Sequence, residues 1–328
     1  MPWHLAAWQQ LQARRQRLPH ALLLTGYAGI GKQQFAQALA ASLLCEQVQD
    51  TGYACGHCTA CNWLAQGTHP DFRRIGLISE AAEEGEGSKR GSQWISIEQI
   101  RELAEFVQLS SHRQGLRVVL LEAADRLNSY AANALLKTLE EPPERVMFLL
   151  VSDQLHRVLP TIRSRCQQVL LPMPELQLAR QWLQAQGQVP DALLDLAGGM
   201  PLLAQRYQQE GWLGEWQQVV SWLSRPKQEP VSLVPGWSKL PLTVMHDWIS
   251  KWLHDLLQVA STGKPRYYPA CQEALQALAG RADRQALLAC LHTVQHAKPL
   301  LTHPLNAKLV MEQWLFAYRG LWQKRAAG

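Results

Sequence analysis

Short β-branched or Leu-rich runs, several of them apolar at successive positions, alternate with longer segments of helical periodicity over the first half of the chain. Five runs are expected to be strands, at residues 21–25, 72–75, 118–121, 147–151 and 168–171, and helical segments such as 32–44 and 129–140 lie between them. Strands that helices cover on both faces are apolar at successive positions rather than at alternate ones. The pattern therefore predicts a parallel α/β domain.

After residue 172 no further strand pattern occurs, and prolines punctuate short helical stretches until a longer helical region begins near Glu210. Nine of the 13 tryptophans follow residue 175, several at helical spacing, such as Trp248 with Trp252. This spacing predicts a core between helices. The Gly-, Ser- and charge-rich segment 78–92 is expected to be a mobile surface loop, and the prolines between 226 and 241 mark an expected irregular connection.

The length of 328 residues and the apolar content of 47% predict two or three domains rather than one. A net charge of +5, from 32 basic and 27 acidic residues, permits contact with nucleic acid without requiring it. The N-terminus lacks the continuous apolar stretch of a signal peptide, and no apolar run is long enough to span a bilayer. We therefore expect a cytoplasmic protein with no membrane partner.

Four of the seven cysteines, Cys45, Cys55, Cys58 and Cys61, form a C-x9-C-x2-C-x2-C pattern. Two cysteines that are three positions apart can bind the same ion, and four thiolates complete the tetrahedral shell of a structural Zn²⁺ site. The pattern predicts structural zinc. A redox pair, or three unrelated thiols with a separately buried Cys45, are the alternatives.

A phosphate-binding loop is indicated at Gly26-Tyr27-Ala28-Gly29-Ile30-Gly31-Lys32-Gln33, between a predicted strand and a predicted helix. The spacing follows G-x-x-x-x-G-K-[ST], in which Gly26, Gly29 and Gly31 would let backbone N–H groups face a polyphosphate and Lys32 would reach its oxygens. The last position fails, because Gln33 stands where a hydroxyl normally ligates Mg²⁺. Nucleotide binding by this chain is therefore doubtful.

The apolar run 118–121 is followed by Glu122 and Ala123, where an active ATPase would carry an aspartate that holds the metal and a glutamate that polarises water. Ala123 has no group that could orient water. Two independent losses, at Gln33 and Ala123, predict weak or absent hydrolysis.

The segment Ala132 to Pro143, reading ANALLKTLEEPP, and the later Ile162-Arg163-Ser164-Arg165-Cys166 resemble the bacterial clamp-loader branch of the AAA+ ATPases. The similarity covers roughly residues 15 to 205. Because the nucleotide site of this chain is degraded, the chain is more similar to the subunits of that family that do not hydrolyse ATP. The resemblance implies an AAA+ α/β domain at 1–166 with a zinc module at 45–61. A helical lid at 167–207 and a helical collar at 208–328 would follow.

The same resemblance implies roles for single residues. Arg165 of the Ser-Arg-Cys motif would enter the ATP site of a neighbouring subunit as an arginine finger, and Ser152 would be a polar sensor beside a γ-phosphate position. A second sensor, usually arginine, aligns with Pro201. The implied partners are gamma/tau and delta clamp-loader subunits of a DNA polymerase holoenzyme, the sliding clamp, and primer–template DNA.

Two other functions remain open on the sequence. An active ATPase of the gamma/tau type would need Glu122 and Gln33 as unusual metal ligands. A stand-alone zinc-bearing nucleic-acid binder would bind DNA without partners and with a strong dependence on salt.

Overall fold

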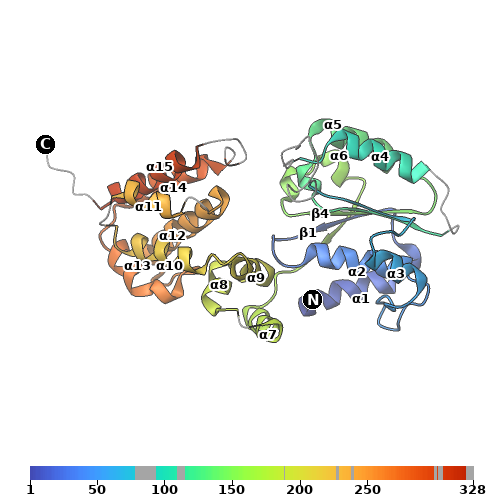
Figure 1. The fold of residues 1–328 in the computed structure, drawn as a ribbon, viewed down its shortest axis with the longest axis horizontal. Coiled ribbons are helices and arrows are strands. Elements are labelled where there is room, and N and C mark those ends of the chain that lie inside the picture. The colour runs from blue at the N-terminus through green and yellow to red at the C-terminus, as the bar shows by residue number, and fades with distance from the viewer. Residues whose placement is uncertain are drawn as a thin grey trace. The chain divides into compact units, whose positions relative to one another are not determined.

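Five strands pair into one parallel sheet in the order β2-β3-β4-β1-β5 in the computed structural model of the chain (Figure 1). The structure describes residues 1–77, 94–108, 115–187, 189–226, 229–237, 240–298, 301 and 306–322. The predicted strands are confirmed, two of them with the expected bounds and three within one residue at each end. The strands are β1 Ala21–Thr25, β2 Phe72–Ile75, β3 Arg117–Leu121, β4 Val146–Ser152 and β5 Gln167–Leu170.

Helices cover both faces of this sheet, with α1, α2 and α3 on one side and α4, α5 and α6 on the other (Figure 1). Alternate residues of β1, β3 and β4, such as Leu23, Val119 and Phe148, are buried in one apolar cluster with residues of α4, α5 and α6. The helices are α1 Leu5–Ala13, α2 Lys32–Leu44, α3 Thr59–Ala65, α4 Ile97–Gln108, α5 Ser129–Glu140 and α6 Pro160–Arg163.

The register of the two central strands decides which loops meet. Thr25, the last residue of β1, pairs with Ser152, the last residue of β4. The carboxyl ends of parallel strands lie at the same edge of a sheet, which is where ligands bind in open α/β folds. The loop that begins at Gly26 and the residue Asp153 therefore leave the sheet side by side.

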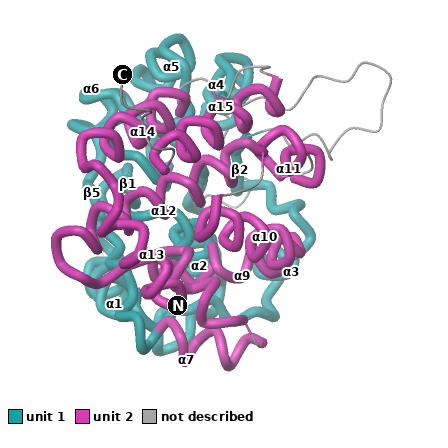
Figure 2. The backbone as a smooth tube through the Cα atoms, turned by 90° about the vertical axis from the view of Figure 1, so that its left-hand side faces the viewer, with its two compact units in different colours: residues 1–178 teal, residues 179–328 magenta. Residues whose placement is uncertain are grey.

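The remaining described elements are helical, which confirms the predicted all-helical C-terminal part. The chain divides into two compact units, residues 1–178 and 179–328, coloured separately in Figure 2. The helices are α7 Leu176–Gln186, α8 Asp191–Leu196, α9 Pro201–Gln209, α10 Leu213–Ser224, α11 Pro230–Trp237, α12 Leu242–Thr262, α13 Gln272–Ala279, α14 Arg284–His296 and α15 Ala307–Gly320. The division of this part into a lid and a collar stays a prediction.

Tryptophans fill the core of the second unit, as their spacing predicts. Trp248 and Trp252 of α12 are fully buried, and the indole N–H of Trp252 donates to the Tyr318 hydroxyl at 2.9 Å. That hydroxyl donates in turn to the Leu223 carbonyl at 2.6 Å. Trp252 and Tyr318 thus bury large areas while their polar atoms are satisfied, whereas the buried indole nitrogen of Trp248 has no hydrogen-bond partner among the described residues.

Two expectations about irregular segments have different outcomes. The irregular connection at the prolines is wrong for residues 230–237, which form α11. Pro230 begins that helix, where a missing backbone N–H costs nothing, although Pro235 lies inside it. The surface loop expected at 78–92 lies outside the described residues.

Candidate nucleotide and metal sites

The predicted phosphate loop connects β1 to α2, and its glycines adopt conformations that other residues avoid. Gly26, Gly29 and Gly31 have φ angles of 148°, 80° and 98°. A Cβ atom on Gly26 would lie 2.7 Å from the backbone oxygen of Leu171, so this position has no room for a side chain. The backbone therefore keeps a glycine-dependent shape that brings all three predicted glycines to the start of α2.

Lys32 is the first residue of α2, and only 3% of its side chain is exposed. Its ammonium lies 2.5 Å from the Asp153 carboxylate and donates to the Tyr27 carbonyl at 2.5 Å. Asp153 was not predicted as a site residue. Within the described residues, the lysine of the phosphate loop is thus already paired with an anion of the same chain.

The N-terminal segment lies against this loop. The indole N–H of Trp3 donates to the Ile30 carbonyl at 2.8 Å, and His4 packs edge-on against Phe35 of α2. Burial, together with the N-terminal ammonium and Lys32, lowers the pKa of His4 to about 4. His4 is therefore neutral at physiological pH and packs as an aromatic residue.

The positions that would hold a metal and a catalytic water have other contacts. Gln33 is exposed to solvent. Glu122, at the end of β3, pairs with Arg74 at 2.8 Å and accepts a hydrogen bond from Gln37 at 3.2 Å. Ala123, next along the chain, offers no acceptor. This arrangement has no positioned base for hydrolysis at the predicted place.

Ser152, the expected sensor, is 1% exposed at the end of β4, and its hydroxyl accepts the backbone N–H of Gln154 at 3.2 Å. Nearby, the buried carboxylate of Asp125 accepts the backbone N–H of Asp153 at 3.1 Å. These bonds fix the backbone that follows β4. Pro201, aligned with a second sensor, is a buried residue at the start of α9.

Arg165 follows α6, with 34% of its side chain exposed. Its guanidinium pairs with Glu140 at 2.5 Å, at the end of α5, and donates to the Thr161 carbonyl at 3.0 Å and the Ser164 hydroxyl at 3.3 Å. A guanidinium has five N–H donors in a planar fork, so donors remain for another acceptor. Arg165 is therefore oriented by its own chain and reachable from solvent.

The four predicted cysteines meet in one cluster between α2 and α3, and all four are free thiols. The sulfur of Cys45 lies 3.9 Å from that of Cys58 and 3.7 Å from that of Cys61, while Cys55 lies 3.9 Å from Cys61. Sulfurs around a tetrahedral zinc, at Zn–S of about 2.3 Å, are about 3.8 Å apart, far longer than a disulfide bond of about 2.05 Å. Cys45 therefore belongs to the cluster, and the donor set fits a metal ion.

Burial and backbone N–H groups act on the pKa values of these thiols in opposite directions. Although burial alone would raise it, the pKa of Cys58 is lowered to about 6 because the N–H groups of Cys61 and Glu46 lie against its sulfur. Burial and the neighbouring sulfurs raise the pKa of Cys61 to about 12. Several thiolates cannot share so small a volume without a cation, so the cluster favours metal binding.

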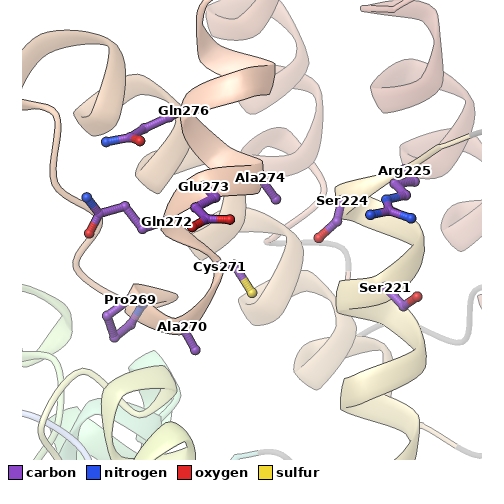
Figure 3. Close-up of a pocket in the computed structure, with 10 residues that line it drawn as sticks. All are labelled: Ser221, Ser224, Arg225, Pro269, Ala270, Cys271, Gln272, Glu273, Ala274 and Gln276. Carbon is purple, nitrogen blue, oxygen red and sulfur yellow. The ribbon is translucent and has the colours of Figure 1, made fainter.

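A separate hollow of about 750 Å³ lies in the second unit, between α10 and α13 (Figure 3). One arginine and one glutamate lie among small and polar side chains there, and no residue predicted as a site lines it. The lining residues are Ser221, Ser224, Arg225, Pro269, Ala270, Cys271, Gln272, Glu273, Ala274 and Gln276. The predicted phosphate loop, cysteine cluster and Arg165 all belong to the first unit.

Comparison with known proteins decides the family. Residues 4–175 match a family described as DNA polymerase III, delta subunit, and residues 215–319 match its C-terminal counterpart. The chain is 36% identical to DNA polymerase III subunit delta' of Pseudomonas aeruginosa, over 98% of this chain and 97% of that one. The chain belongs to the DNA polymerase III delta' family. This confirms the clamp-loader resemblance and extends it beyond residue 205, where the motifs end.

Other members of the holoenzyme are similar over shorter parts. Subunit delta' of Escherichia coli is 36% identical over 61% of this chain and 58% of its own length. Subunit tau of that organism is 34% identical over 51% of this chain and 24% of its own length. A solved gamma subunit-related protein of Thermotoga maritima covers 96% of this chain and 99% of its own at 15% identity and a TM-score of 0.48. Of the helices that the structure describes, none could cross a membrane.

The residues that sequence reasoning missed are the partners of the expected site residues. Asp153 pairs with Lys32, and Arg74 and Gln37 hold Glu122. One signal for Asp153 was present, since it directly follows a predicted strand, and adjacent parallel strands end at one edge. The pairing of β1 with β4 was needed to use that signal.

Proposed function

We propose that this chain is a clamp-loader subunit that does not hydrolyse ATP and that places Arg165 in the nucleotide site of a neighbouring subunit. One observation carries the proposal: the unit that carries Gln33 and Ala123 at the hydrolytic positions also presents an oriented, reachable arginine. Ala123 and Gln33 remove chemistry from the chain's own site, whereas Arg165 keeps donors for an outside acceptor.

The contacts of Arg165 suit a role toward a partner. Its ion pair with Glu140 joins two partly exposed side chains, and such surface pairs contribute only about 0 to 1 kcal/mol. A γ-phosphate carries more negative charge than one carboxylate and accepts both prongs of a guanidinium, so it can displace Glu140. Arginine fingers of this kind contribute about 10³ to 10⁵ in rate.

The other parts of the proposal follow from family membership. The four cysteines would hold Zn²⁺, which would fix the segment between α2 and α3 without taking part in ATP chemistry. Residues 167–207 would form a lid and residues 208–328 a collar. The partners would be gamma/tau and delta subunits, the sliding clamp, and primer–template DNA.

A reconstituted complex of the chain with gamma/tau and delta subunits tests the arginine. Arg165→Ala should assemble normally but lower DNA-stimulated ATP hydrolysis and clamp loading by at least about tenfold. Arg165→Lys, which keeps the charge but loses the fork, should be nearly as defective. Arg101→Ala, at an exposed arginine of α4, is the control for a lost surface charge.

Unchanged loading by Arg165→Ala would remove Arg165 from the mechanism. Steady-state hydrolysis by the isolated, zinc-loaded chain tests the other half of the proposal. Turnover that Lys32→Ala abolishes would favour an active motor of the gamma/tau type.

A further inference from the structure

We propose that Asp153 places its carboxylate where a nucleotide phosphate would meet Lys32, and so excludes polyphosphates from this chain's own loop. The inference deepens the proposed function, on which it rests, because it names a residue that would keep ATP out of this chain's own site. Gln33 and Ala123 bear on metal binding and hydrolysis. Asp153 acts one step earlier, on binding itself.

The burial of Lys32 is the first observation. A buried ammonium needs an anion or several hydrogen-bond acceptors, because the loss of hydration is otherwise very costly. In a working phosphate loop the β- and γ-phosphate oxygens supply that charge. Here the side chain is 3% exposed, and Asp153 supplies the charge at 2.5 Å while the Tyr27 carbonyl accepts a second hydrogen bond.

The position of Asp153 is the second observation. Its backbone is fixed by the end of β4, paired with β1, and by the hydrogen bond from its N–H to the buried Asp125 carboxylate at 3.1 Å. Little conformational freedom therefore has to be lost when its side chain meets Lys32. The sheet holds the backbone of Asp153 in place, so forming the ion pair costs little conformational entropy.

The exposure of Asp153 is the third observation. Its side chain is 51% exposed while its partner is buried, so the ion pair reaches solvent on the side of the carboxylate. An arriving polyphosphate would have to break the ion pair and then remain beside a negative charge. Asp153 therefore pairs with Lys32 and also repels the polyphosphate that the lysine of a phosphate loop usually binds.

Calorimetric titration of the isolated full chain with ATP, and separately with inorganic pyrophosphate, tests the inference. Wild type should show no saturable binding at millimolar ligand. Asp153→Asn, which keeps the shape of the side chain and removes its charge, should bind both ligands at least about tenfold more tightly. Asp153→Ser should show the same gain, which guards against a folding defect peculiar to one variant.

Two matched variants separate this role from a general change in stability. Asp153→Glu keeps the charge and should bind no better than wild type. The double variant Lys32→Met with Asp153→Asn should lose the gain, because the lysine is then absent. Tight binding by wild type, or neutral variants that bind no better than wild type, would overturn the inference. Either result leaves the test of Arg165 in the complex unaffected, so the two failures can be told apart.

Discussion

The phosphate loop and the cysteine cluster lie at the two ends of α2 and have kept different things. The loop keeps its backbone, with three glycines at positive φ, but its lysine is paired internally and its metal position carries Gln33. The cluster keeps both shape and chemistry, with four free sulfurs at spacings suited to one ion. The backbone shape of a site and its side-chain chemistry therefore have separate causes, because backbone geometry depends on glycine and packing whereas reactivity depends on a few side-chain atoms.

The largest effect should come from breaking the cluster. Cys61→Ser leaves three sulfurs and an oxygen that binds zinc poorly, so bound zinc should fall from one ion per chain to a small fraction. Zinc sites contribute about 10 to 16 kcal/mol to the folding of small peptides, so residues 45–61 should unfold locally. Metal analysis and limited proteolysis measure both effects.

Local unfolding in Cys61→Ser should also destabilise α1. The ring of Trp8 in α1 stacks on that of Tyr53 with centroids 4.3 Å apart, and its indole N–H donates to the Thr51 carbonyl at 3.0 Å. Cys271→Ser, in the second unit, is the matched control and should keep full zinc content. Full occupancy in Cys61→Ser would mean that the cluster does not bind metal as a set of four.

A smaller effect should come from the backbone of the loop. Gly26→Ala forces a Cβ to within 2.7 Å of the Leu171 oxygen at a φ of 148°, and should cost about 3 kcal/mol of unfolding free energy. Gly56→Ala, in the cysteine cluster, has a φ of 83° but open space around it, and should cost about 1 kcal/mol. Urea unfolding followed by circular dichroism compares them, and equal costs would show that the loop relaxes around the new methyl group.

The smallest effect should be a pH dependence at the N-terminal segment that packs against the loop. The pKa of His4 is about 4 in the folded state and 6.5 ordinarily. Between these two pH values the unfolded chain therefore binds a proton on His4 and the folded chain does not. Stability is therefore full above about pH 6.5 and is lost as the pH falls, by about 2 kcal/mol between about pH 7 and about pH 5. Hydrogen exchange of the α1 amides measures it.

His4→Leu should remove most of that dependence, whereas His57→Gln, at an exposed histidine beside the cysteines, should leave it unchanged. A slope that survives His4→Leu would place the sensitive group elsewhere.

Much of the fold follows from local pattern. Successive apolar residues gave β1 its predicted bounds, β2 also has the predicted bounds, and α2 and α5 begin and end where their periodicity predicts. The stretch around Pro235 shows where local rules fail, since a helix forms despite an internal proline when Val234 and Trp237 are buried in the core. Packing overrides propensity there.

The candidate sites divide along the same line. The glycines, Lys32 and the four cysteines could be predicted because each set is defined by spacing along the chain. The pairing of Lys32 with Asp153 joins residues 121 positions apart, and it depends on the register of β1 against β4. No local pattern contains that register, so the partner of Lys32 was found only in three dimensions.

The concentration of indoles in one unit has a practical consequence. Nine of the 13 tryptophans lie in the second unit, many of them buried. Intrinsic fluorescence during denaturation will be dominated by that helical half, while the half that carries both candidate sites contributes little light.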